Sequence, residues 1–167
     1  MTTTSDTPAP TLYSGVVESP IGPLTVVASN AGIRAVLWPL EPAGRVKVDL
    51  DDEARSSALV EEAAAQLRRY FEGNLHRFDL PPDPVGTEFQ LSVWFALSEI
   101  PYGSTSTYAE HARRVGRPGS ARAVGSANGR NPLSIVLPCH RVIGADGSLT
   151  GFAGGLQAKR YLLALES

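Results

Sequence analysis

The chain has 167 residues, 43% of them hydrophobic and 19% charged, which suits a globular protein with one core or two small ones. No apolar run is long enough to span a bilayer, and the N-terminus lacks the basic and apolar regions of a secretory signal, so we expect a cytoplasmic protein. A single cysteine and three scattered histidines exclude an internal disulfide and give no ligand spacing for a metal.

The first predicted domain, residues 12–85, begins with strands. Residues 1–11 ahead of it are polar and are predicted to form a disordered tail. Residues 12–38 contain apolar and β-branched runs that are separated by turn residues. The turn at Asn30-Ala31-Gly32 lies between two such runs and predicts a hairpin.

A helix is predicted over residues 56–72, where apolar residues recur at helical spacing after a loop at 39–53. Residues 76–80 are a candidate for one more strand. The proline-rich run at 81–86 is a stiff connector and the best domain boundary in the chain. The pattern predicts an α/β domain with a small antiparallel sheet.

The second predicted domain, residues 86–167, is mostly helical. A helix at 87–100 carries an apolar stripe in which Trp94 is expected as a core residue, with a place in a substrate pocket as the second interpretation. Two short helices, at 107–115 and 120–129, are joined by a glycine-containing turn and form a candidate helix-turn-helix.

Basic residues concentrate around these two helices. The window from His111 to Arg141 holds six of the 15 basic residues of the chain and none of its 17 acidic ones. A basic window on an otherwise acidic protein is typical of a polyanion-binding surface. The alternative is a solvated, arginine-rich surface without a partner.

The second of these helices carries one long cation, Arg122, among small residues, of which Ala121, Ala123, Gly125 and Ala127 line the candidate DNA surface. Small side chains allow another surface to approach the backbone closely, which favours a narrow DNA groove over reading base edges in the major groove. Tight packing against another helix explains the same pattern equally well. Arg130 follows the helix as a further candidate DNA contact.

The stretch Ile135–Gly144, IVLPCHRVIG, contains the only cysteine. Its apolar start predicts a buried segment, and Pro138 should interrupt the strand pattern before Cys139. His140 can take the thiol proton, and Arg141 adds positive potential and a possible DNA contact. Neighbours in an extended chain point to opposite faces, so this chemistry requires a bend at Cys139 or a bridging water. The alternative is a buried structural cysteine.

Three further features surround this stretch. Asn131 can bridge the end of the basic helix to the cysteine turn through side-chain hydrogen bonds. The glycine-rich loop at 151–155 exposes amides that could donate to a ligand oxygen. Glu166 lies at the end of the final helix, 156–166, where a carboxylate opposes the helix dipole. This placement predicts a partner for Glu166, and His140 is the candidate.

Together these motifs closely resemble the signature of the O6-alkylguanine-DNA alkyltransferases, also called methylated-DNA–protein-cysteine methyltransferases. The resemblance covers roughly residues 12–166. It lies in Ile135–Gly144, Ile100-Pro101-Tyr102-Gly103, Tyr108, Ala121-Arg122-Ala123-Val124-Gly125, Asn128, Asn131-Pro132, Thr150 to Gly155 and Ser19 to Leu24.

The resemblance implies an α/β N-terminal domain and a helical C-terminal domain whose helix-turn-helix enters the minor groove. It implies direct reversal of damage, in which an alkyl group moves irreversibly from guanine O6 in duplex DNA to the cysteine, without a cofactor. O4-alkylthymine is a second candidate substrate. We expect a monomer that binds double-stranded DNA, alone or cooperatively, and no membrane.

The resemblance also assigns roles to residues. It implies that Cys139 is the alkyl acceptor, that His140 activates it through a water, and that Glu166 orients His140. Asn131 would support the turn, Tyr108 would donate to guanine N3, and Arg122 would fill the gap left by a flipped nucleotide. Phe152 and Ala153 would line the pocket. Many members have tyrosine at the Phe152 position, whereas Phe152 can pack on a base but cannot donate a hydrogen bond.

Two other classes of protein fit parts of the pattern. A DNA-binding regulator would use the helix-turn-helix and leave Cys139 idle. A cysteine hydrolase would use Cys139 and His140 through many turnovers and an acyl intermediate. The basic window and the small-residue helix disfavour the hydrolase.

Overall fold

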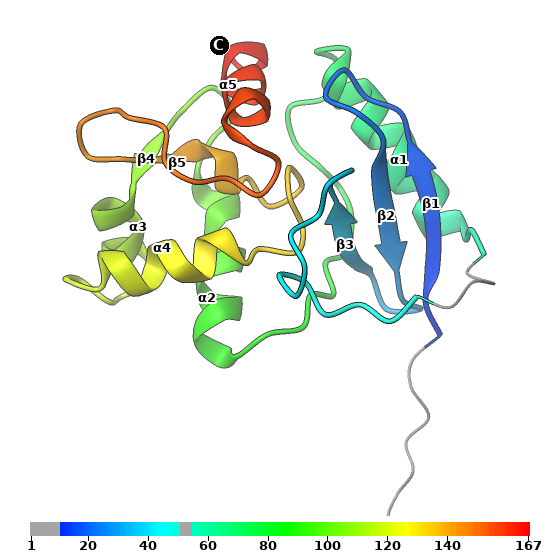
Figure 1. The fold of residues 1–167 in the computed structure, drawn as a ribbon, viewed down its shortest axis with the longest axis horizontal. Coiled ribbons are helices and arrows are strands. Elements are labelled where there is room, and N and C mark those ends of the chain that lie inside the picture. Colours follow the sequence, from blue (N-terminus) through cyan, green and yellow to red (C-terminus); the bar gives the residue numbers. More distant parts are fainter. Residues whose placement is uncertain (1–10, 51–54) are drawn as a thin grey trace, which may run out of the picture.

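The computed structural model describes residues 11–50 and 55–167 (Figure 1). Residues 1–10 of the predicted tail and residues 51–53 of the predicted loop lie outside the described residues. Among the described residues, no helix has the length and apolar character needed to cross a membrane.

The N-terminal domain is a small antiparallel sheet with one helix against it. Strands β1 (Tyr13–Val17), β2 (Leu24–Ala28) and β3 (Ile33–Leu37) follow each other in the sheet, and the predicted hairpin joins the last two. Helix α1 (Ala58–Phe71) begins after Ser57, whose hydroxyl accepts a bond from the Val60 amide. Its apolar side covers the sheet, as its spacing predicts (Figure 1).

The predicted strand at 76–80 is wrong. The backbone of Asp79 bonds to the side chain of Gln66 on α1, as both donor and acceptor, at 2.9 and 3.0 Å. A helix side chain therefore satisfies the groups that would otherwise pair with a strand. The sheet edge at β3 is instead met by Pro82, which forms a single parallel bridge with Ile33.

The C-terminal domain is helical, as predicted. Its elements are α2 (Glu88–Ala96), the 3-10 turn η1 (Leu97–Glu99), β4 (Ser106–Thr107), α3 (Tyr108–Arg114), α4 (Ala121–Gly129), the 3-10 turn η2 (Cys139–Arg141), β5 (Val142–Ile143) and α5 (Leu156–Leu165). The two short strands pair in parallel, which the sequence did not indicate. Ser120 precedes α4, but its side chain makes no capping bond.

Trp94 is a core residue, so its assignment to the substrate pocket is wrong. Its side chain lies between α2 and α4 and is 2% exposed. The indole Nε1–H donates to the Ala127 carbonyl at 2.7 Å. This bond satisfies the indole donor and fixes α4 on α2.

The two domains share one continuous hydrophobic core. The chain leaving α4 runs along the open edge of β3, where the Val36 amide donates to the Pro132 carbonyl at 2.8 Å. Beyond β3, the Trp38 indole donates to the Ser134 hydroxyl at 3.0 Å. The sheet of one domain thereby holds the segment that leads to Cys139 in the other.

Candidate active site and nucleic-acid interface

The backbone bends at Cys139, as the proposed chemistry requires. Residues Cys139–Arg141 form a 3-10 turn, and the Ile135 backbone before it has a φ of 73°, which is uncommon for a β-branched residue. Such a conformation persists only where its surroundings fix it. The predicted brace is present, because Asn131 Nδ2 donates to the Leu137 carbonyl at 2.8 Å and Oδ1 accepts from the Leu133 amide at 3.1 Å.

Glu166 follows α5 and is the centre of a buried network. Its Oε2 lies 2.7 Å from His140 Nε2, which confirms the predicted pairing of Glu166 with His140. Its Oε1 accepts from Arg141 Nε at 2.7 Å. The hydroxyl of Tyr70, on α1 of the other domain, donates to the same Oε2. Three donors thus offset the repulsion between this carboxylate and the C-terminal end of the helix.

The prediction that Arg141 contacts DNA is wrong. Its side chain is buried, and besides Glu166 it binds the Ile100 carbonyl through Nη1 at 2.7 Å. A guanidinium whose donors are occupied inside the protein cannot reach a phosphate. Arg141 instead joins His140 in lowering the pKa of Glu166 through its hydrogen bonds to the carboxylate.

The electrostatics of the network set each protonation state. Burial alone would raise the pKa of Glu166, but hydrogen bonds from His140 and Arg141 bring it down to about 2. Burial lowers the pKa of His140, which Glu166 offsets only in part. Burial raises the pKa of the Cys139 thiol. At neutral pH the site therefore holds a thiol, a neutral imidazole and a carboxylate.

The tautomer of His140 follows from these states. Because the Glu166 carboxylate only accepts, the facing His140 Nε2 must carry the ring proton. The other nitrogen, Nδ1, is buried and has no hydrogen-bond partner among the described residues. Its lone pair is therefore available to take a proton, which is what a general base beside Cys139 requires.

Lys159, on α5, is a site residue that the sequence reasoning missed. It is 1% exposed, and its Nζ donates to the carbonyls of Val142 at 2.7 Å and Thr150 at 3.3 Å. Its charge, like that of Arg45, opposes the rise in the pKa of Cys139. Burial lowers the pKa of Lys159 itself. Its only sequence signal is a lysine on the side of α5 that also carries apolar Ala158 and Leu162.

The residues of α4 divide between two surfaces. Arg122 and Ala123 are exposed, Ala121 is half-buried, and Arg130 is exposed just beyond the helix. Ala127 is buried, so its assignment to the DNA surface is wrong. At Gly125 a Cβ atom would lie 3.4 Å from the Tyr108 ring, which is an ordinary van der Waals contact, so the packing of α3 does not require glycine there. Packing inside the protein therefore accounts for Ala127, and a DNA surface at the exposed Ala123 stays a prediction.

Tyr108 and the glycine-rich loop meet on one side of the site. The Tyr108 hydroxyl lies 2.5 Å from Thr150 Oγ1, directly before the loop. Phe152 is half-buried with its ring edge-on to Trp38, and the neighbouring Ala153 is half-buried as well. At Gly154 a Cβ atom would lie 2.7 Å from the Trp38 ring, so only glycine lets the loop lie this close. The first domain thus supports the loop.

Comparisons with known protein families match both domains of the chain. Residues 12–84 match the family described as 6-O-methylguanine DNA methyltransferase, ribonuclease-like domain. Residues 88–167 match its DNA binding domain. The chain therefore belongs to the 6-O-methylguanine DNA methyltransferase family.

Several relatives share most of the chain. A methylated-DNA--protein-cysteine methyltransferase of Methanosarcina acetivorans is 48% identical over 156 residues, covering 93% of this chain and 98% of that protein. One of Mycobacterium tuberculosis is 48% identical over 158 residues, covering 93% and 92%. The crystal structure of Mycobacterium tuberculosis OGT in complex with DNA matches with a TM-score of 0.82 and 44% identity, over 92% of each chain.

The first prediction concerns Glu166→Gln. Because folding lowers the pKa of Glu166 from 4.5 to about 2, its ionisation stabilises the protein above pH 4.5, and this contribution is lost as the pH falls toward 2. Leaving Arg141 without its counter-charge should lower the free energy of unfolding at pH 7 by about 3–5 kcal/mol. Urea unfolding across this pH range should also show a flatter pH dependence than wild type. The exposed control Glu72→Gln should change the free energy of unfolding by less than about 0.5 kcal/mol. If Glu166→Gln kept the pH dependence of wild type, the ionised, hydrogen-bonded state of Glu166 would be contradicted.

The second prediction concerns Lys159→Met, which keeps the length of the side chain and removes its charge. The pH midpoint for ionisation of the Cys139 thiol should rise, because a cation that favours the thiolate is lost. Stability should fall by about 1–3 kcal/mol, since the Val142 carbonyl loses its donor. The neighbouring Arg160 is exposed, so Arg160→Met is the matched control. Thiolate absorbance against pH measures the midpoint, and equal midpoints in both variants would rule out the electrostatic role.

Proposed function

We propose that this protein repairs duplex DNA by moving the alkyl group of O6-alkylguanine onto Sγ of Cys139. The observation that carries the proposal is the set of buried groups Cys139, His140 and Glu166, in which Glu166 bonds to His140 in the same turn as the cysteine. A thiol that burial keeps protonated needs a base at hand, and His140 presents an unprotonated nitrogen in the same turn.

The reaction is a displacement at carbon. His140 Nδ1 takes the thiol proton, directly or through a water, while Glu166 stabilises the imidazolium that forms. The sulfur then forms a bond to the alkyl carbon as the bond from that carbon to guanine O6 breaks. The electron pair of the broken bond goes to the base, which recovers a proton and becomes guanine. The thiol proton and the alkyl group have then exchanged places.

The alkyl carbon must leave the base stack before sulfur can approach it in line, so the nucleotide is flipped out. We assign the gap that it leaves to Arg122, whose exposed side chain stands at the start of α4 among small residues. The α3–α4 pair then acts as a helix-turn-helix that enters the minor groove, with Ala121 and Ala123 facing the duplex. Arg130 contacts phosphate at the other end of the helix.

The pocket for the flipped base lies between Tyr108 and the glycine-rich loop. Tyr108 donates to guanine N3 as the leaving base gains negative charge, and its bond to Thr150 holds the hydroxyl in place beforehand. Phe152 and Ala153 line the pocket, and the Ala153 amide donates near O6. O4-alkylthymine carries the same type of O-alkyl bond and is the second substrate to test.

The product is a thioether, which is stable, so each protein molecule reacts once. Cys139 is the only cysteine in the chain, so no second thiol of the protein can displace the alkyl group. The proposal requires no cofactor and assigns a monomer acting in the cytoplasm.

The third prediction separates base flipping from the chemistry. Arg122→Ala should slow single-turnover alkyl transfer from duplex O6-methylguanine by about 10- to 100-fold, because unstacking costs a few kcal/mol that the arginine helps to offset. Transfer from the free base O6-benzylguanine, which needs no flipping, should keep its wild-type rate. Arg113→Ala removes an exposed charge from the same basic window on α3 and serves as the control. If both variants slowed alkyl transfer from duplex DNA equally, Arg122 would act only as a general phosphate contact and not in base flipping.

A further inference from the structure

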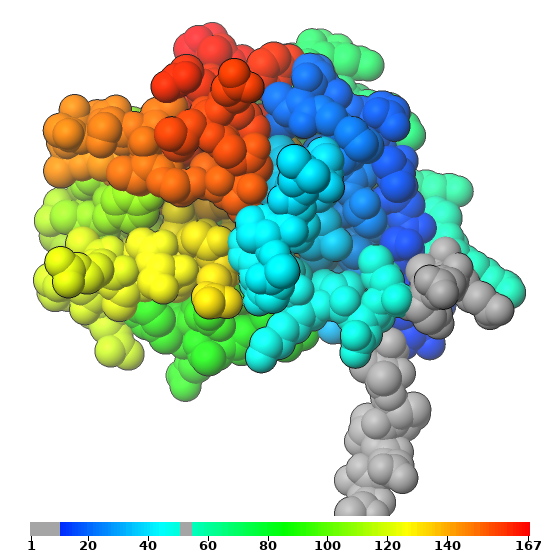
Figure 2. Space-filling view, in the orientation of Figure 1, coloured from blue at the N-terminus to red at the C-terminus, as the bar shows by residue number. Residues whose placement is uncertain are grey.

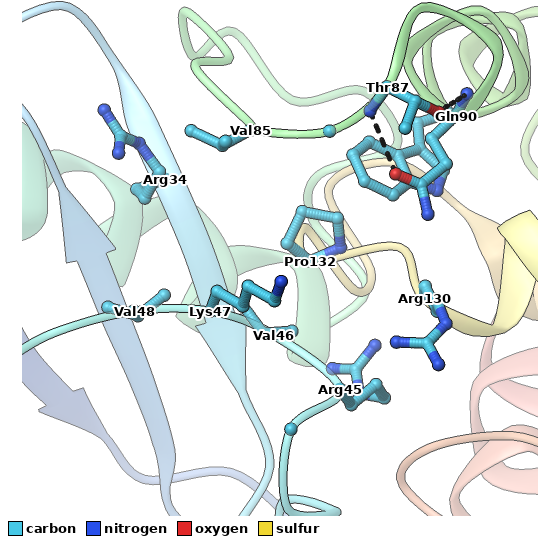
Figure 3. Close-up of a pocket in the computed structure, with 13 residues that line it drawn as sticks. Arg34, Arg45, Val46, Lys47, Val48, Val85, Thr87, Gln90, Arg130 and Pro132 are labelled. Atoms are coloured by element: carbon cyan, nitrogen blue, oxygen red, sulfur yellow. Dashed lines mark hydrogen bonds between the residues drawn. The ribbon is translucent and has the colours of Figure 1, made fainter.

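Basic side chains also line a cleft between the two domains, which has a volume of about 400 Å³ and does not include Cys139 in its walls. Its walls are the segment 44–48 that follows β3, the connector at 85–87 with the start of α2, and residues 130 and 132 beyond α4 (Figure 3). Four cationic side chains line it, namely Arg34, Arg45, Lys47 and Arg130, and no Asp or Glu among the described residues does.

The hydrogen-bond donors of this cleft outnumber their acceptors. Arg34 pairs with Asp83 at 2.9 Å, yet its Nε is buried and has no partner among the described residues. Arg45 pairs with Glu41 and donates to the Asn131 carbonyl at 2.7 Å. Its side chain is 8% exposed, and Nη2 is likewise buried without a described partner. A buried donor without an acceptor costs about 1–3 kcal/mol, so an anion in the cleft is favoured.

The remaining two cations are accessible. Lys47 and Arg130 are exposed, and neither forms an ion pair with any residue that the structure describes. In Figure 3 the guanidinium groups of Arg130 and Arg45 lie next to each other, and the Lys47 side chain extends toward Pro132. A cleft lined by two side chains with buried donors that lack a described partner and by two accessible cations suits a phosphate group, which presents several acceptor oxygens.

The cleft also lies on the side of the molecule that carries α4. Figure 2 shows the segment around 39–50, in cyan, directly beside the yellow end of α4, and Arg45 bonds to residues on both sides of Arg130. The nine residues of α4 span about 13 Å, which is roughly four base pairs of duplex. A duplex that runs along α4 from Arg122 would therefore reach Arg130, which lines the cleft beyond the end of the helix.

We infer that this cleft binds a backbone phosphate of the DNA strand that passes the C-terminal end of α4. The N-terminal domain, through Arg34, Arg45 and Lys47, then contributes to DNA binding together with Arg130. The inference rests on the proposed function, since it needs the duplex to lie along α4. It adds a phosphate contact on a domain that carries none of the other proposed DNA-contacting residues.

The contact is also connected to the acceptor turn. Arg45 reaches the cleft with one part of its guanidinium and holds the Asn131 carbonyl with another. The side chain of Asn131 in turn binds the Leu137 carbonyl two residues before Cys139. Arg45 is therefore unsuitable as a test of phosphate binding alone, and Lys47 is the cation to vary.

The fourth prediction uses Lys47→Glu, with Arg68→Glu on α1 as a control that makes the same type of charge reversal at an exposed site. Lys47→Glu should weaken binding to a duplex by about tenfold at low salt, and the slope of log K against log salt should become less steep by about 0.9 for the lost phosphate contact. Arg68→Glu should keep the affinity and the salt slope of wild type, apart from the small change that any charge reversal causes through net charge. Fluorescence anisotropy over a salt series measures both.

Three outcomes overturn the inference. Equal affinities and slopes for the two variants would remove the phosphate contact. Calorimetric binding of inorganic phosphate that Lys47→Glu abolishes, with duplex affinity intact, would assign the cleft to a free anion instead of DNA. Slower reaction of Lys47→Glu with free O6-benzylguanine would place Lys47 in the chemistry. Failure of wild-type protein to take a methyl group from duplex DNA would count against the proposed function, whichever way Lys47→Glu binds.

Discussion

One buried carboxylate, that of Glu166, connects the last helix, the cysteine turn and the N-terminal domain. Glu166, at the end of the last helix, accepts hydrogen bonds from His140 and Arg141 in the cysteine turn and from Tyr70 in the other domain. A buried carboxylate is costly unless its charge is paired and its oxygens are bonded. Here the two adjacent residues that follow Cys139 satisfy it, so the position of the turn and the ionisation of the carboxylate depend on each other.

The N-terminal domain also supports the cysteine turn. Strand β3 holds the segment after α4, Trp38 supports Ser134 and the glycine-rich loop, and Tyr70 completes the bonds to Glu166. Elements of both domains thus hold the turn at Cys139–Arg141 in place. Such support is what keeps a backbone as unusual as that of Ile135 in place.

Local patterns in the sequence predicted most of the fold. The position of Glu166 at the C-terminal end of a helix, where a carboxylate is unfavourable, predicted its pairing with His140. The errors arose where a tertiary contact overrode a local signal. Arg141 lies in a basic window, but its guanidinium is directed inward to Glu166. Gln66 takes the backbone bonds of a predicted strand, and Lys159 lies on the buried side of a helix because two distant carbonyls accept from it. Spacing along the chain does not encode these partners.

Intact-protein mass spectrometry tests the central claim most directly. The protein is incubated with a duplex that carries one O6-methylguanine, and Cys139→Ala is run beside it. The account predicts a gain of one methyl group per protein molecule, located on Cys139, with no further gain at excess DNA and none in Cys139→Ala. Duplex binding without any gain in mass would contradict it and favour a DNA-binding regulator whose cysteine is idle. Repeated turnover with an acyl intermediate would instead indicate a hydrolase.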